Sequence, residues 1–204
     1  MQGIHLISNG RLTEKELDFV ARNMELLDFF HLREKKKTAQ EIADLADRLM
    51  DTDVPRERII INDRVDVAHV KRCGGAQLAY HSLTIANVKA CFPHLLVGKS
   101  VHSLAEALDA EQQGADYLLY GHIFPSNSKR GAEPRGVAAL AELTRNVSLP
   151  VIAIGGIHTS NVHQVLAAGA NGIAIMSGIW DAEDPVKALK HYRDVFDKVE
   201  GGVV

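Results

Sequence analysis

Residues 149–179 read LPVIAIGGIHTSNVHQVLAAGANGIAIMSGI, and this stretch holds the repeat that decides the fold. Two short apolar runs, Val151–Ile154 and Ile173–Met176, flank a segment whose apolar residues have helical spacing, Val162–Gly169. Each run is continuous rather than alternating, as in parallel strands that are covered on both faces. The stretch therefore predicts a strand–helix–strand unit with two parallel strands.

The same alternation of apolar runs and helical segments continues through the chain. Capping signals predict that helices start after Thr13, Thr38, Ser103 and Asp184. Residues 1–204 contain no linker and no abrupt change of composition, so we expect one domain. The eight apolar runs are Ile4–Ile7, Leu27–Leu32, Ile59–Ile61, Ala76–Ala79, Leu95–Val97, Tyr117–Tyr120, Val151–Ile154 and Ile173–Met176.

Eight strand–helix units predict an α/β protein that closes into a single (β/α)8 TIM barrel. The length of 204 residues lies near the lower limit of about 200 residues for this fold, so the barrel has few insertions. The alternative is an open doubly wound sheet. That fold usually has a glycine-rich first turn, whereas residues Ser8–Arg11 contain one glycine and no dinucleotide fingerprint.

Composition excludes several classes of protein. The formal charge of −3 argues against binding of nucleic acid through bulk charge. The longest apolar run has five residues, Val137–Ala141, so we expect no membrane span. The first residues lack the pattern of a signal peptide, and Cys73 and Cys91 suggest neither a disulfide framework nor a zinc knuckle. We therefore expect a cytoplasmic protein.

The loops after the last two predicted strands are the candidate phosphate site. In a TIM barrel, backbone N–H groups at these two loops often bind phosphate. Gly155 and Gly156 leave the backbone bare for phosphate oxygens, and Met176 and Ser177 add N–H groups and a hydroxyl. The alternative is that the glycines only form a tight turn between strand and helix.

A basic cluster follows the second predicted strand. Arg33 and Lys35 alternate there, so both side chains can reach the barrel mouth and meet a carboxylate or phosphate. A solvated loop is the alternative. After the third strand, Asn62 and Asp63 can bind Mg²⁺, or the carboxylate can cap the next helix. One carboxylate does not make a magnesium site, so we expect no metal.

His122 is the candidate catalytic residue. It follows the predicted strand Tyr117–Tyr120 and precedes a polar loop, and imidazole is suited to acid–base catalysis near neutral pH. A buried histidine that bonds the backbone is the alternative. Ser126 and Ser128 of the same loop are candidate hydrogen-bond donors to a substrate.

The segments named above, in this order, resemble the thiamine phosphate synthase superfamily. The resemblance covers most of the chain, and its motifs are specific only in combination. The matching stretches are 31–35, 60–68, 98–103, 115–129, 150–157 and 172–179.

Two departures from the pattern of the synthases favour another branch of that superfamily. The synthases hold Mg²⁺ with the Asp of the Asn-Asp motif and with a second acidic residue after the fourth strand, where this chain has Ser82. They usually have proline after the glycine that ends the sixth strand, where this chain has His122. The combination resembles the thiazole tautomerases of thiamine biosynthesis (the TenI branch).

This resemblance implies an isomerase that aromatises a small phosphorylated thiazole carboxylate, with His122 transferring the proton and no metal or organic cofactor. Arg33 or Lys35 would hold the carboxylate, and Asn62 and Ser128 would add hydrogen bonds. Gly156, the N–H of Met176 and Ser177 would hold the phosphate. It also implies a dimer or larger homo-oligomer. The alternatives are the Mg²⁺-dependent thiamine phosphate synthase itself and a non-catalytic regulator that binds a phosphorylated ligand.

Overall fold

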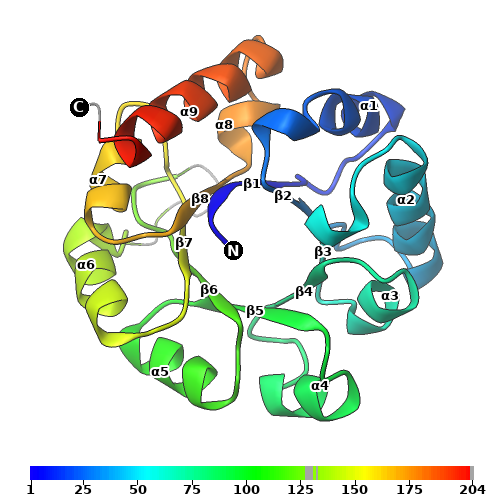
Figure 1. The fold of residues 1–204 in the computed structure, drawn as a ribbon, viewed down its shortest axis with the longest axis horizontal. Coiled ribbons are helices and arrows are strands. Elements are labelled where there is room, and N and C mark those ends of the chain that lie inside the picture. Colours follow the sequence, from blue (N-terminus) through cyan, green and yellow to red (C-terminus); the bar gives the residue numbers. More distant parts are fainter. Residues whose placement is uncertain (127–130, 132, 203–204) are drawn as a thin grey trace.

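The chain forms a closed ring of eight parallel strands surrounded by helices (Figure 1). The computed structural model describes residues 1–126, 131 and 133–202. Each strand pairs with the next, and β8 closes the ring by pairing with β1. The predicted (β/α)8 barrel is confirmed. The strands are β1 Gly3–Ile7, β2 Phe29–Leu32, β3 Ile59–Asn62, β4 Gly75–Leu78, β5 Leu96–Val101, β6 Tyr117–Gly121, β7 Val151–Ile154 and β8 Gly172–Ile175.

The helices follow the strands and cover the outside of the ring. They are α1 Glu14–Arg22, α2 Ala39–Asp51, α3 Val65–Val70, α4 Ile85–Cys91, α5 Leu104–Gln112, α6 Gly136–Asn146, α7 Val162–Ala167, α8 Ser177–Trp180 and α9 Pro185–Glu200, with 3-10 turns at Met24–Leu26 and Arg56–Arg58. Of the helices in the described part of the chain, none combines the length and the apolar character that crossing a membrane requires.

Three of the four predicted helix caps are present as expected. The cap at Ser103 differs in part. Thr38 accepts a hydrogen bond from the N–H of Glu41, whose carboxylate accepts one from the N–H of Thr38 at 2.7 Å. At α5, Ser103 caps the helix as predicted, but the carboxylate of Glu106 accepts from the N–H of His102 instead. The capping box is therefore shifted by one residue, and it holds the end of β5 against α5.

Two strand boundaries differ from the apolar pattern by more than one residue. β5 extends to Val101, beyond the apolar run, because the ammonium of Lys99 donates to the carbonyl of Ala79 and Ser100 lines the cavity at the barrel mouth. β2 begins at Phe29, since the residues before it form a 3-10 turn. The short helix α8 follows β8 directly, so Ser177 is a helical residue rather than part of a loop.

The barrel has two cores with different chemistry. The large core between strands and helices is apolar and includes Ile4, Leu6 and Phe30. Inside the ring, a small apolar cluster around Ile7, Leu119 and Ile152 shares the space with polar side chains. His5, His31 and Gln77 are fully buried there, in positions that branched aliphatic residues usually fill.

Candidate active site

A cavity of about 1250 Å³ opens at the carboxyl ends of the strands. All the predicted site residues that the structure describes line it, and Ser128 lies outside the described residues. Their roles remain predictions, but the fold places them together. They are Arg33, Lys35, Asn62, His122, Ser126, Gly155, Gly156, Met176 and Ser177.

The loops after β7 and β8 form the wall suited to phosphate. Among the hydrogen bonds of the described residues, none uses the N–H groups of Gly156, Ile157, Ser177 or Gly178 as donors. The turn after β7 is fixed by Asn161, whose Nδ2 donates to the carbonyl of Gly156 at 3.0 Å. Amide groups that are held in place and free to donate suit an anion.

Gly155 and Gly156 make room for the loop after β6, a role that the sequence analysis did not identify. A Cβ atom on Gly155 would lie 2.3 Å from Cβ of His122, and one on Gly156 would lie 2.4 Å from the carbonyl oxygen of Pro125. Both glycines also have positive φ angles, +98° and +65°. The bare face of the pair therefore receives the loop after β6, while the amides remain available to a ligand.

That packing fixes His122 at the cavity wall. The N–H of Ile123 donates to the carbonyl of Ile154, and the N–H of Phe124 donates to that of Gly155, both at 3.0 Å. His122 is 5% exposed, and its carbonyl accepts from the N–H of Arg135 at 2.9 Å. His122 is thus tied to the phosphate wall through the backbone on either side.

A second group of cavity residues, after β2, is strongly basic. Burial lowers the pKa of Arg33, and the charge of Arg33 is the largest cause of a lowered pKa at Lys35. In the described parts of the chain, no salt bridge joins Arg33, Lys35 or Lys37 to a carboxylate. Glu34 offsets part of the charge of Arg33, and the remaining positive charge at the mouth of the cavity favours an anionic ligand.

The loops after β3 and β4 bring together Asp63 and His81, a histidine that the sequence analysis did not single out. Nε2 of His81 lies 3.7 Å from Oδ2 of Asp63, and both line the cavity. Ser82 is engaged within its own loop, because its hydroxyl accepts from the N–H of Ala79 at 2.8 Å. The position of His81 in the loop after β4 was the available signal.

Glu34 is a further residue that sequence reasoning missed. It lines the cavity yet is 4% exposed, and neither carboxylate oxygen has a hydrogen-bond partner among the described residues. Its place in a run of basic residues favoured a solvated loop. The run is instead divided, with Glu34 buried and Lys36 exposed.

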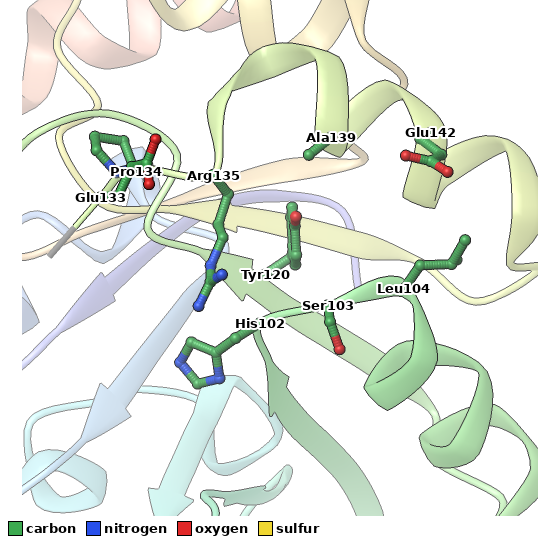
Figure 2. A pocket seen from close by; sticks show the side chains of 9 residues that line it. All are labelled: His102, Ser103, Leu104, Tyr120, Glu133, Pro134, Arg135, Ala139 and Glu142. Carbon is green, nitrogen blue, oxygen red and sulfur yellow. The ribbon is translucent and has the colours of Figure 1, made fainter.

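A smaller cavity of about 330 Å³ is lined by His102 and by residues of α6 and of the loop before it. Figure 2 shows the side chain of Arg135 extending toward the His102 ring, with Ser103 and Tyr120 beside them. Glu133 and Glu142 also line this cavity, so it mixes both signs of charge. His102 lines both cavities.

Comparison with known proteins gives a consistent result. The family model described as thiamine monophosphate synthase matches residues 4–179. The thiamine-phosphate synthase of Pyrococcus abyssi is 43% identical over 141 residues, which cover 69% of this chain and 68% of that protein. The thiamine-phosphate synthase of Desulfitobacterium hafniense strain Y51 is 39% identical over 171 residues, or 81% of each chain.

Solved structures agree with these relatives. Thiamine phosphate pyrophosphorylase from Pyrococcus furiosus superposes with a TM-score of 0.86 at 33% identity, covering 97% of this chain and 96% of that one. A 3-hexulose-6-phosphate synthase, with a TM-score of 0.72 and 17% identity, shares the fold alone.

These findings overturn the expectation of an isomerase. The tautomerase prediction gave decisive weight to Ser82 and His122, whereas the relatives similar over most of the chain are named synthases. The match of the family model, together with these relatives, places the chain in the thiamine monophosphate synthase family.

Proposed function

We propose that the chain is a thiamine-phosphate synthase, a transferase that joins a pyrimidine diphosphate and a thiazole phosphate. The observation that carries the proposal is one cavity with two groups suited to anions, the amides after β7 and β8 and the cations after β2. Its volume of about 1250 Å³ exceeds the roughly 300–1,000 Å³ of most ligand pockets, which suits two substrates.

In this reaction the bond between the methylene carbon of the pyrimidine and the diphosphate oxygen breaks, and its electron pair leaves with the diphosphate. The ring nitrogen of the thiazole bonds to that carbon, so the reacting atoms exchange no proton. Positioning and charge stabilisation are therefore the main tasks of the protein.

Different residues of the cavity would position the substrates and stabilise the charge. Arg33 and Lys35 would receive the negative charge of the departing diphosphate, with Asn62 adding a hydrogen bond. The amides of Gly156 and Ser177 would hold the phosphate of the thiazole. His122 packs against Gly155, so we assign it a hydrogen bond to that phosphate rather than acid–base catalysis.

Membership of the family also implies Mg²⁺, which the resemblance places on Asp63 and on an acidic residue after β4. The residues present do not fit a metal held by two carboxylates. Asp63 contacts His81, and the second position is Ser82, whose hydroxyl already accepts from the N–H of Ala79.

The activity itself is the first test. Incubation with the pyrimidine diphosphate and the thiazole phosphate is expected to yield thiamine phosphate and pyrophosphate, which chromatography and a pyrophosphate assay would detect. The assay is run with Mg²⁺ and with EDTA. Saturable binding of the thiazole phosphate without product under either condition would contradict the proposal and favour a binding protein.

The basic group after β2 gives a second prediction. Arg33→Gln is expected to weaken diphosphate binding by about 10- to 100-fold, because a hydrogen bond to a charged group contributes about 1.5–3 kcal/mol. Lys36→Gln removes the same charge three residues away, outside the cavity lining, and serves as the control. Equal effects of the two substitutions in calorimetric titrations would mean that only bulk charge matters.

A further inference from the structure

The carboxylates near the diphosphate end of the cavity are few. Asp66, which does not line the cavity, is bound by Arg64, and Glu34 is buried with no hydrogen-bond partner among the described residues. Asp63 lies 3.7 Å from the imidazole of His81. Among the residues that the structure describes, no group of three or more His, Cys, Asp or Glu side chains could hold a metal ion.

Positive charge lines the same cavity. Arg33, Lys35 and Lys37 lie there, and in the described residues no salt bridge joins them to a carboxylate, although the charge of the neighbouring Glu34 acts on Arg33. A divalent cation and a diphosphate respond to this field in opposite ways, because the field repels the first and attracts the second. The cations can therefore neutralise a diphosphate directly.

We propose that this chain binds the diphosphate group of its substrate through Arg33, Lys35 and Lys37, without a divalent cation held by the protein. The protein holds no divalent cation because of the loop after β4. Ser82 of this loop lacks a carboxylate, and its hydroxyl accepts from the N–H of Ala79. The inference rests on the proposed function, because that function supplies the diphosphate substrate.

Calorimetry with inorganic pyrophosphate tests the inference without turnover. Pyrophosphate is expected to bind at least as tightly in EDTA as in excess Mg²⁺, and Arg33→Gln is expected to weaken the binding in EDTA. Binding that is about tenfold tighter with Mg²⁺, a difference of about 1.4 kcal/mol, would overturn the inference. The absence of binding under both conditions would overturn it as well.

A substitution at position 82 tests whether the missing carboxylate explains the absence of a metal site. Ser82→Asp is expected to create a metal site with Asp63, seen as loss of the free Mn²⁺ signal in electron paramagnetic resonance when pyrophosphate is present. Ser82→Asn has the same size without the charge and is expected to leave the free Mn²⁺ signal as in the parent protein. Both side chains can still accept from the N–H of Ala79, so the loop is kept. If Ser82→Asp binds no Mn²⁺, the assignment to this position is wrong.

The turnover assay separates this inference from the proposed function. Thiamine phosphate formed in EDTA supports both. Thiamine phosphate formed only with Mg²⁺ supports the function and overturns the inference. If pyrophosphate binds in EDTA but no thiamine phosphate forms under any condition, the metal-free diphosphate site stands and the synthase function does not.

Discussion

Gly156→Ala is expected to lower kcat/KM for thiamine phosphate formation by at least about 100-fold, because misplacing catalytic groups by about 1 Å can cost that much. The new Cβ would lie 2.4 Å from the carbonyl oxygen of Pro125 and 2.7 Å from that of Phe124. Both obstacles are backbone atoms, so no side chain can rotate away. Phe124 is also held by its hydrogen bond to Gly155, so relief requires moving the loop that carries His122.

The positive φ angle of +65° at Gly156 adds about 1–2 kcal/mol of strain for alanine. Gly114→Ala separates this strain from the collision. Gly114 has a φ of +88°, but a Cβ there meets no atom within 4 Å. Circular dichroism melting is expected to show some loss of stability for both variants, with loss of turnover for Gly156→Ala alone. Turnover of Gly156→Ala within a few-fold of the parent would contradict the packing argument.

The fold followed from local pattern because a barrel repeats one unit. Continuous apolar runs predicted the parallel strands, and capping residues such as Thr38 and Asp184 predicted helix starts that the structure contains. The residues that line the cavity could also be predicted, because all strands of a barrel end at the same face and the residues after them meet there. Gly156 after β7 and Arg33 after β2 thus line one cavity although 123 positions separate them in the sequence.

Other features of the site could not be predicted from the sequence pattern, because they depend on side-chain direction and on contacts between residues far apart in the chain. The collision partner of Gly156 is a loop about 30 positions earlier in the sequence, which no local spacing reveals. The contact between His81 and Asp63 likewise joins two loops. The function was harder to predict than these contacts. Ser82 and His122 indicated a tautomerase, whereas the relatives that match most of the chain are named synthases.

The interior of the barrel carries an acid-sensitive pair of histidines. Nδ1 of His5 and Nε2 of His31 are 2.9 Å apart, and both side chains are fully buried. Burial lowers the pKa of His31 to about 3. Burial, followed by the nearby His31, holds the pKa of His5 well below its ordinary value. The folded barrel therefore keeps both rings neutral at pH values where the unfolded chain would protonate them.

Stability is expected to fall as the pH falls below about 6.5, the ordinary histidine pKa. Between pH 6.5 and the pKa of about 3 at His31, the unfolded chain binds more protons than the folded one, so the free energy of unfolding decreases toward acid. Two such groups contribute a slope of up to about 2.7 kcal/mol per pH unit. Above pH 7.5 the pair contributes no further change.

Urea unfolding followed by circular dichroism between pH 5 and 8 would measure this slope. His31→Gln is expected to reduce the slope by about half, whatever its effect on stability at neutral pH, because one of two titrating rings is gone. His191→Gln, at an exposed position on α9, is the matched control and is expected to keep the slope of the parent. The slope, rather than the absolute stability, is the diagnostic quantity, since losing a buried hydrogen bond alone shifts the whole curve without tilting it. An unchanged slope in His31→Gln would show that the acid sensitivity arises elsewhere, and that the two rings do not have to remain neutral for the barrel to fold.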